Sequence, residues 1–564
     1  MFEEKLTSNF FVKKAAIAGV REGSVIEFKY VLLDEGIGLP LNEWVFQNPV
    51  APTLWSEFEA SVPTFIEYKK LAQGWTPYSL AKEELKNERL NISYIERGPA
   101  NAAVTTSTAE NINVDYSTNI LHFIQENVPA LKPEPFVASV RDYLSKISFD
   151  VKAVYNTTVV ANGPTYKLVN TTFQERNKSW ERLGKDLLED TYKDILGSSK
   201  FTGAQTAVCI EGKSTPLDKT AAIYAYIGKN YQISDFDDFW KSQTMDHLTK
   251  DRKGTPTDLN LLFINMLHRA NVNAYPVLIS TQEHGKALSF RISAQEFNRV
   301  ISAVVLEDST ITLIDASGWP NPLGLLPEAA VNDKGLLLNE KEGIKWIPLQ
   351  NKIADRSALM AEFSIDADGN VTGKATFSET GHSTVSARKL IQSKDIQTYA
   401  TEHFKNLVDG GLMSNLKVEE DLDWNTPTLK GSFELLSPSF MSIAGNKIYL
   451  NPMIKLGLKE TPFRNPERKF GIDFGSPSNM SYVFSFNIPP GYKVEEAPKS
   501  TKLTMAENAL TFDYIVDKSK PELVKIVVKI NIKTPFIPVE QFADLQQFYS
   551  TMVAKMAEQI VLTK

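Results

Sequence analysis

Apolar and polar residues alternate along much of the first third of the chain. In residues 25–31, Ile26, Phe28 and Tyr30 fall on one face of an extended chain, with charged side chains between them, and this is the period of a half-buried strand. The same period predicts strands at residues 65–68 and 149–154, and three prolines predict an extended connector at residues 127–136. We therefore expect an antiparallel β-rich domain over residues 1–175.

The apolar spacing changes to three and four in the middle of the chain. Residues 216–229 place one row of apolar side chains along a helix, namely Leu217, Ala221, Tyr224 and Ile227. Apolar runs then predict strands of one sheet at residues 274–279, 300–306 and 310–314. Helices packed against such a sheet predict an α+β middle domain over residues 176–352.

A second helix of this domain, predicted at residues 257–270, has a well-marked start. Thr255 can act as the N-cap, Pro256 suits the first helical position, and Asp258 follows three residues after the cap. Asp258 also lies near the positive end of the helix dipole. Together these residues predict where the helix begins.

Alternation returns after residue 353. It predicts strands at residues 374–378, 482–488 and 524–532, and a change of period predicts helices at residues 386–408 and 539–556. The last helix carries an apolar stripe of Phe542, Leu545, Tyr549, Met552 and Met556. We expect a β-rich C-terminal domain with helices over residues 353–564, which makes the whole chain a multidomain α+β protein.

Composition and charge exclude several functional classes. A chain of 564 residues suits roughly three or four domains, and 42% hydrophobic residues predict that it folds throughout. The net charge is −7, from 61 basic and 68 acidic residues without a long basic run, which argues against nucleic acid as a partner. No apolar stretch reaches the roughly 18 residues that a bilayer requires, so no transmembrane segment is expected.

The first residues bear on the cellular compartment of the protein, and its cysteine and histidines bear on disulfides and metal sites. The first residues lack the order of a secretory signal peptide, which suits a cytoplasmic protein or a secreted one whose signal and first strands lie upstream of Met1. Cys209, the single cysteine, excludes an internal disulfide, and its apolar neighbours indicate packing. The six histidines lack the spacing of metal ligands, so we expect no metal and no cofactor.

Four segments of the middle domain resemble the transglutaminase-like superfamily in their order and spacing. They are PLDKTAAIYAYIGKNYQI at residues 216–233, RKGTPTDLNLLFINMLHRANVNAYPVLIS at residues 252–280, FNRVISAVV at residues 297–305 and TLIDAS at residues 312–317. The resemblance implies a papain-like core. In active members of the family, a cysteine at a helix start, a histidine on a following strand and an aspartate after it form the catalytic triad.

This chain departs from the family at two of the three catalytic positions. Pro256 stands where the family has its cysteine, Arg299 stands where it has its histidine, and Asp315 matches the aspartate. Proline suits the backbone of a helix start but offers no nucleophile, and arginine stays charged and cannot accept a proton. The resemblance therefore implies a pseudoenzyme, in which we expect Arg299 and Asp315 to form an ion pair across the former active site.

Segments on both sides of the core resemble β-rich domains of unknown function that accompany it in bacterial envelope proteins. They are GSVIEFKYVL at residues 23–32, NEWVFQNPVAP at residues 42–52, NVPALKPEPF at residues 127–136 and RNPERKFGIDF at residues 464–474. The resemblance implies β-sandwich domains and a periplasmic or cell-surface location. It also leads us to expect that the N-terminal domain lacks its usual opening strands.

Three functional hypotheses follow. The first is a binding or scaffold protein that holds a polypeptide or cell-wall-derived ligand in the degenerate cleft, with a groove lined by Thr255, Asp258, Asn298 and Trp319. The second is a hydrolase or acyl transferase that acts on amide bonds, with a nucleophile drawn from Thr255, Thr257 and Cys209. The third is a structural spacer whose groove is filled by its own side chains. The missing cysteine and histidine favour the first hypothesis, and the sequence leaves the oligomeric state open.

Overall fold

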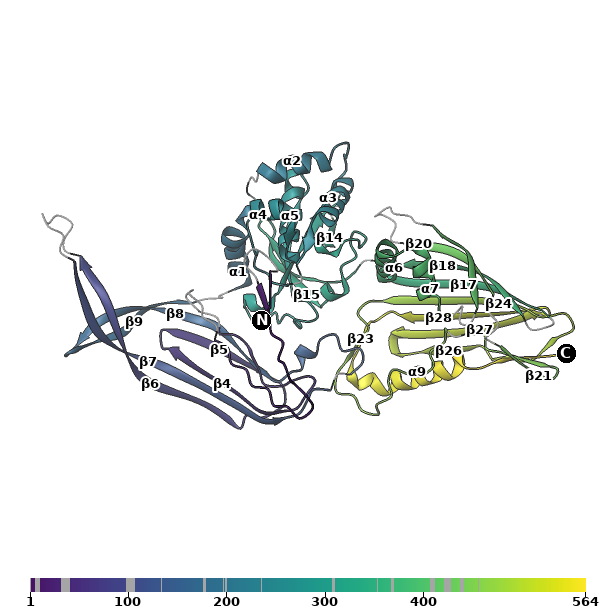
Figure 1. The fold of residues 1–564 in the computed structure, drawn as a ribbon, viewed down its shortest axis with the longest axis horizontal. Helices are drawn as coiled ribbons and strands as arrows, with labels where there is room; N and C mark the ends of the chain where they lie inside the picture. Colours follow the sequence, from purple (N-terminus) through teal and green to yellow (C-terminus); the bar gives the residue numbers. More distant parts are fainter. Residues whose placement is uncertain are drawn as a thin grey trace.

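The protein is multidomain and α+β, as the sequence predicts. The structure, a computed structural model, describes residues 2–5, 11–31, 41–97, 107–132, 134–175, 179–195, 197, 200–234, 236–306, 310–351, 353–366, 370–405, 411–419, 428–436, 441–454 and 456–564. Figure 1 shows β-rich parts at the two ends of the molecule and a helical part between them.

The N-terminal part is one large sheet with a core of aromatic and aliphatic side chains. Its strands are β3 Trp44–Val45, β4 Thr53–Pro63, β5 Ile66–Gln73, β6 Leu80–Arg97, β7 Ser107–Val128, β8 Lys146–Asn162 and β9 Thr165–Glu175. The order is β3-β8-β9-β7-β4, with β5 paired to β8 and β6 to β7. Phe46, Leu121 and Phe149 lie in its core. The strands predicted at residues 65–68 and 149–154 are confirmed by β5, which begins one residue later, and by β8.

The strand predicted at residues 25–31 is wrong. A short hairpin, β1 Phe2–Lys5 and β2 Phe11–Lys14, comes first, but residues 25–31 have no regular secondary structure. Val25 and Phe28 are 96% and 78% exposed. Alternation produces a strand only where a neighbouring strand supplies hydrogen-bond partners, and within the described residues no strand pairs with this segment.

The middle part packs helices against a five-stranded sheet. The helices are α1 Trp180–Asp186, α2 Lys200–Cys209, α3 Pro216–Asn230, α4 Met245–Asp251 and α5 Pro256–Arg269, and the sheet strands are β12 Ala274–Ile279, β13 Arg299–Val305, β14 Ile311–Ile314, β15 Lys334–Asn339 and β16 Gly343–Pro348. The sheet order is β14-β13-β12-β15-β16, and every neighbouring pair is antiparallel. A short parallel pair, β10 Gln232–Ile233 and β11 Lys253–Gly254, precedes α5.

Helix α5 is the centre of this part. Leu261, Phe263 and Met266 are all 0% exposed although they point in different directions around the helix, so α5 is buried on nearly all sides. The two helices and three strands predicted here from the sequence are confirmed, with bounds that differ by one or two residues. The central position of α5 matters because its first turn forms the floor of the site described below.

The C-terminal part contains one large and one small sheet. The large one has the order β19-β20-β18-β17-β24-β28-β27-β26, with strands β17 Asp355–Ile365, β18 Val371–Thr380, β19 Leu412–Glu419, β20 Thr428–Leu436, β24 Ser478–Asn487, β26 Thr501–Thr504, β27 Leu510–Lys520 and β28 Leu523–Ile532. The small one has the order β21-β22-β30-β25, with strands β21 Met441–Ala444, β22 Lys447–Leu450, β25 Lys493–Glu496 and β30 Ile560–Thr563. A two-residue pair joins β23 Ile472–Asp473 to β29 Phe536–Ile537. The three strands predicted here lie within β18, β24 and β28.

Helices α6, α7 and α9 accompany these sheets in the part of the chain that the structure describes. Helix α9 Phe542–Met556 has the predicted apolar stripe, all of it buried. The single helix predicted at residues 386–408 is wrong, because the structure has two helices, α6 His382–Ser393 and α7 Ile396–His403. Asp395 accepts a hydrogen bond from the Thr398 amide at 2.7 Å and caps α7, which separates the two helices. The end of the predicted range falls in residues 406–410, outside the described residues.

The β-rich ends contact each other below the middle part. The Glu134 carboxylate, in the connector after β7, accepts hydrogen bonds from the backbone amides of Lys469 and Phe470 at 2.9 and 3.1 Å. Phe470 packs with Leu131 and Leu144 of the N-terminal part. The connector predicted at residues 127–136 therefore joins the two ends and is not a free linker.

Candidate functional site

The three positions that the sequence resemblance matches to a catalytic triad, Pro256, Arg299 and Asp315, lie at or beside the first turn of α5. Thr255 accepts a hydrogen bond from the Asp258 amide at 3.2 Å, and the Asp258 carboxylate accepts one from the Thr255 amide at 3.0 Å. This reciprocal pair is a capping box, with Pro256 at the first helical position. The sequence prediction of the helix start is confirmed. A residue at position 256 faces a cavity from the positive end of the α5 dipole.

Arg299, the first residue of β13, lies between two carboxylates. Its Nε and Nη2 donate to the two oxygens of Asp237 at 2.7 and 2.5 Å, and its Nη1 donates to Asp315 Oδ2 at 3.3 Å. The Arg299 side chain is 12% exposed. Burial alone would lower the pKa of Arg299, but Asp315 and Asp237 outweigh burial and raise it. The guanidinium is therefore a permanent cation that cannot serve as a base.

Asp315 is held in place by a set of donors. Its side chain is fully buried, and besides Arg299 it accepts hydrogen bonds from Asn260 Nδ2 at 2.8 Å and from the amide and hydroxyl of Ser317 at 2.9 and 2.6 Å. Asn260 in turn accepts from the Ala316 amide at 2.9 Å. The ion pair between Arg299 and Asp315 that the sequence suggested is present, and its geometry is fixed from behind by α5.

A cavity of about 400 Å³ opens in front of these residues. Pro256 and Arg299 lie in its floor, and Asp237 and Phe236 come from the loop after β10. The opposite wall is helix α6 of the C-terminal part, which contributes His382, Val385, Ser386 and Lys389. The cleft is therefore formed by two parts of the chain that are separate in sequence.

His382 joins the two walls of this cleft. Its Nδ1 lies 3.2 Å from Asp355 Oδ2 and its Nε2 lies 2.8 Å from the backbone oxygen of Leu326. Asp355 and Leu326 both offer acceptors, and the Asn351 amide nitrogen lies 3.5 Å from Nε2. An imidazolium, which donates from both ring nitrogens, suits the two shorter contacts. Burial lowers the pKa of His382, but the hydrogen bonds to Asp355 and Leu326 outweigh burial and raise it above the usual value.

The four residues proposed from the sequence as groove-lining lie elsewhere. Thr255 and Asp258 are 0% and 2% exposed and serve the helix cap. Asn298 bonds both the amide and the hydroxyl of Thr281, at 2.8 and 2.9 Å. Trp319 packs on Tyr224 with ring centroids 5.5 Å apart. None of the four is among the described residues that line the cavity, because each is used in packing or capping.

The alternative nucleophiles are also engaged or misplaced. Thr257 is 0% exposed and its hydroxyl accepts a hydrogen bond from the Val300 amide at 2.9 Å. Cys209 ends α2 and is not among the described residues that line the cavity. Burial raises the pKa of its thiol, which disfavours the reactive thiolate. These positions give no support to an acyl transfer chemistry.

Asp237 and the residues of α6 were not found by sequence reasoning. Asp237 lies in a run, SDFDDFW, that has neither strand nor helix period. Helix α6 begins only at His382, far beyond Pro256 and Asp315 in sequence. Tertiary contact alone brings them to the cleft. The sequence held one signal for Asp237, namely charge, because a buried arginine such as Arg299 requires carboxylate partners.

One cluster away from the cleft has the composition of a metal site. Glu57, Glu59 and His122, on the paired strands β4 and β7, have ligand atoms that all lie within 4.8 Å of one another. The two glutamates are exposed, and His122 Nε2 lies 2.7 Å from Glu57 Oε1. Such cross-strand pairs are common without a metal, and the absence of a metal site stays a prediction. Within the described residues, no helix is long and apolar enough to cross a membrane.

Comparisons with known proteins agree with this architecture. A model of the transglutaminase-like superfamily matches residues 204–312, and a model of a domain of unknown function with a solved structure, DUF3858, matches residues 446–562. The search of curated proteins found no match. The core match includes most of α2, the helices α3 to α5 and the strands β12 and β13. It therefore contains Pro256, the first residue of α5, and Arg299, the first residue of β13.

Two solved structures are similar to the chain. One is a protein from Parabacteroides distasonis described as a "putative protease", with 12% sequence identity, coverage of 93% of this chain and 74% of that chain, and a TM-score of 0.51. The other, from Cytophaga hutchinsonii, is described as a "putative cysteine protease", with 10% identity, coverage of 47% and 75%, and a TM-score of 0.17. The first similarity extends the shared fold to nearly the whole chain, and the second is too low to support an argument.

Proposed function

We propose, for a chain whose middle part is a transglutaminase-like domain followed by a DUF3858 domain, that the degenerate cleft binds a polypeptide or a cell-wall-derived peptide without cleaving it. The observation that carries this proposal is the position of Arg299 between Asp237 and Asp315. A permanent cation occupies the general-base position, and Pro256 occupies the nucleophile position. Neither can take part in acyl transfer.

The walls of the cleft suit a peptide. Phe236 and Val385 offer apolar contact, and the exposed side chains of Ser386 and Lys389 on α6 offer a hydrogen-bonding group and a positive charge. A cavity of about 400 Å³ holds a few residues of an extended chain. A ligand in this position would contact both the middle part and α6, so its affinity would depend on both walls.

We further propose that this binding takes place in the bacterial envelope. The support for this location is the resemblance of the flanking β-rich parts to domains that accompany the same core in envelope proteins. Fractionation of the native host, with immunodetection of the protein in periplasmic, membrane and cytoplasmic fractions, tests the location. Recovery in the cytoplasmic fraction alone would refute it.

The competing proposal is a hydrolase or acyl transferase, and the description of the similar Parabacteroides distasonis structure as a protease is the observation that favours it. One experiment separates the two. The purified protein is incubated with a panel of glutamine-containing peptides and cell-wall peptides, and mass spectrometry and ammonia release record any turnover. Fluorescence anisotropy of the same labelled peptides records binding. We expect saturable binding and no turnover.

Variants locate the binding and test for residual chemistry. Phe236→Ala and Lys389→Ala should each weaken binding about tenfold, because each removes one contact on a different wall. Lys345→Ala, an exposed change on β16, is the matched control and should leave binding unchanged. Turnover that disappears in Thr255→Ala, Thr257→Ala or Cys209→Ala would replace the binding proposal with the enzymatic one and would identify the nucleophile.

A further inference from the structure

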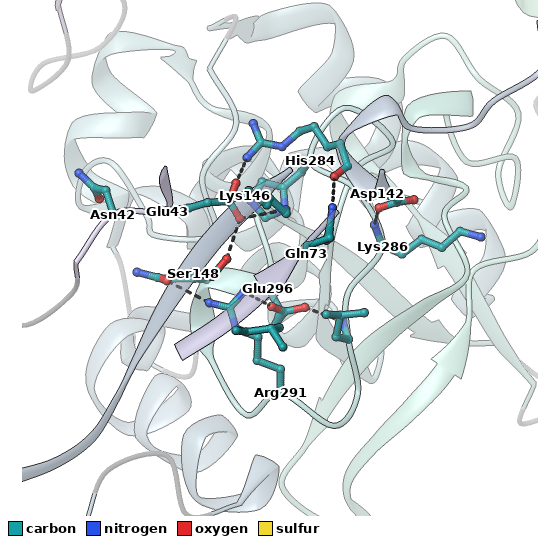
Figure 2. Close-up of a pocket in the computed structure, with 14 residues that line it drawn as sticks. Asn42, Glu43, Gln73, Asp142, Lys146, Ser148, His284, Lys286, Arg291 and Glu296 are labelled. Atoms are coloured by element: carbon teal, nitrogen blue, oxygen red, sulfur yellow. Dashed lines mark hydrogen bonds and ion pairs between the residues drawn. The ribbon is translucent and has the colours of Figure 1, made fainter. Parts of the chain in front are cut away.

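A second cavity lies between the N-terminal and middle parts, where the loop between β12 and β13 forms one of its walls. It has a volume of about 340 Å³. Figure 2 shows that its walls are almost entirely polar, with Glu43, Lys146 and Ser148 from the N-terminal part and His284, Arg291 and Glu296 from the middle part. The size suits a small molecule of roughly one residue or a short peptide end.

The frame of this cavity is rigid because buried ion pairs join its two walls. Arg291 donates Nε and Nη2 to the Asp150 carboxylate of β8 at 2.7 and 2.8 Å, and donates Nη1 to Glu296 at 2.7 Å. All three side chains are less than 10% exposed. The Asp142 carboxylate of the N-terminal part accepts from the Lys286 amide at 2.7 Å. These bonds fix the spacing of the walls without filling the space between them.

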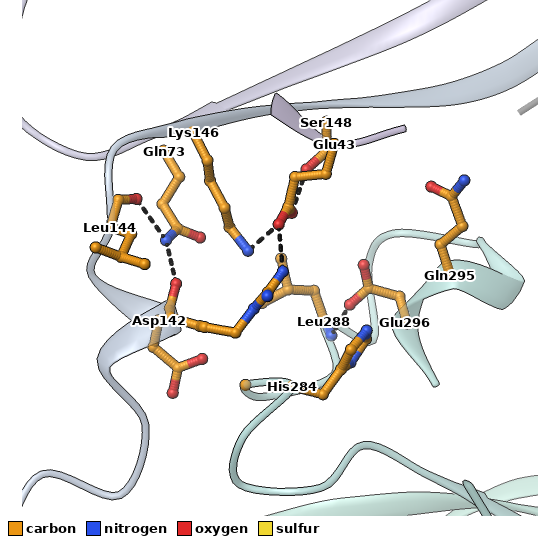
Figure 3. Close-up of polar contacts among 12 residues, drawn as sticks. Glu43, Gln73, Asp142, Leu144, Lys146, Ser148, His284, Leu288, Gln295 and Glu296 are labelled. Carbon is orange, nitrogen blue, oxygen red and sulfur yellow. Dashed lines mark hydrogen bonds and ion pairs between the residues drawn. The ribbon is translucent and has the colours of Figure 1, made fainter. Parts of the chain in front are cut away.

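One donor in the cavity has no partner. Arg141 uses its Nη2 to donate to Glu43 at 2.6 Å, but its Nε is buried and makes no hydrogen bond with any described residue. Figure 3 shows the Lys146 amino group directed at the Glu43 carboxylate, with Lys146 Nζ at 2.9 Å. A buried cationic N–H without an acceptor is costly, so an anionic oxygen from outside the chain would be stabilised there.

One acceptor in the cavity is also without a partner. The Ser280 hydroxyl donates to the Gly285 oxygen, so His284 Nδ1, 2.8 Å away, must donate to the Ser280 oxygen. The Nε2 atom of His284 then carries a lone pair, and no described residue donates to it. Burial, followed by the charge of Arg141, lowers the pKa of His284 to about 4, so the ring is neutral and keeps this lone pair at neutral pH.

The charges around the cavity cancel. The lining has four cations, Arg141, Lys146, Lys286 and Arg291, and three anions, Glu43, Asp142 and Glu296. A fourth anion, Asp150, lies outside the lining and pairs with Arg291. Asp142 also has a carboxylate oxygen, Oδ2, to which no described residue donates a hydrogen bond. A cavity with no net charge, one unused cationic donor and unused acceptors suits a zwitterion, which carries one positive and one negative charge.

We propose that this cavity binds the zwitterionic head of an α-amino acid, free or at the end of a small peptide. The carboxylate accepts from Arg141 Nε and Lys146, and the ammonium donates to His284 Nε2 and Asp142 Oδ2. The site is separate from the peptide cleft of the proposed function, and its occupant would contact both the N-terminal and the middle part.

Isothermal titration calorimetry of the full-length protein tests this proposal. Each of the twenty free L-amino acids is titrated separately, and the tightest ligand is compared with two matched analogues that lack either its amino group or its carboxylate. We expect saturable one-to-one binding by at least one amino acid and at least a tenfold loss with each analogue. Absence of binding by all twenty would overturn the proposal, and so would equal binding by either analogue.

Two conservative variants test the assigned atoms. Arg141→Lys keeps the charge beside Glu43 but removes the Nε donor, and His284→Asn keeps a donor toward Ser280 but removes the Nε2 acceptor. Each should weaken binding at least tenfold, whereas Arg182→Lys on the exposed face of α1 should not. Thermal melts show whether each variant is folded. Unchanged affinity in both folded variants would show that the ligand binds elsewhere. Retained peptide binding by these variants separates this site from the cleft.

Discussion

Arg299 donates a hydrogen bond to Asp315 across the floor of the cleft, at 3.3 Å, in a fully formed ion pair. In the family that the sequence resembles, these positions hold the histidine and aspartate of a catalytic triad. Asp315 thus neutralises a permanent cation. Asp237 completes the neutralisation from the opposite side with two further bonds.

Removal of Asp315 should destabilise the protein. Asp315→Ala leaves Arg299, which is 12% exposed, with one carboxylate fewer in a buried site, and we expect a loss of about 3 kcal/mol in the free energy of unfolding. Asp237→Ala should lower the free energy of unfolding by less, because the Asp237 side chain is 28% exposed and water can replace it. Denaturant unfolding of both variants measures the difference. An Asp315→Ala protein as stable as the original would show that the ion pair has no structural role.

The cleft should still be able to activate a thiol. In a Cys209→Ser background, Pro256→Cys places a thiol at the α5 start, and adding Arg299→His places an imidazole beside Asp315. We expect the thiol pKa of the double replacement to be lower than that of Pro256→Cys alone by at least about one unit, because an imidazolium stabilises the thiolate. The pH dependence of alkylation by iodoacetamide measures it. Identical pH profiles with and without Arg299→His would mean that the imidazole does not reach the thiol at position 256.

His382 should make stability depend on pH above neutrality. Its pKa in the folded protein is raised, so its stabilising contribution is complete below the unfolded value of about 6.5 and is lost as pH rises through the folded value. His382→Gln keeps a donor toward Leu326 but does not titrate. The difference in melting temperature between the original protein and the His382→Gln variant should therefore shrink from pH 6 to pH 9. A constant difference would contradict the imidazolium assignment.

His284 should have the opposite effect at acid pH. Its pKa falls from 6.5 to about 4 in the folded protein, so the unfolded chain binds the proton first and stability is lost as pH falls from 6.5 to 4. At about 1.4 kcal/mol per unit, the loss reaches about 3 kcal/mol. Melting curves of the original protein and His284→Asn across this range provide the measurement. Parallel curves would place His284 in contact with solvent.

The sequence predicted the local structure well where short-range signals agree. The start of α5 follows from Thr255, Pro256 and Asp258, because a cap, a proline and a first-turn carboxylate all act within four residues. Apolar runs likewise identified β12 and β13. The failure at residues 25–31 has a clear reason, since alternation describes a face and says nothing about whether a neighbouring strand is present.

The sequence by itself determined that the middle part is transglutaminase-like, and that Pro256 begins one of its helices. Only the tertiary structure brought Asp237 to Arg299, placed α6 across the cleft and aligned Arg141 with His284 at the second cavity. Each of these relationships joins residues far apart in the chain. Residue periodicity records local geometry, whereas ion pairs and cavities depend on how separate elements pack together.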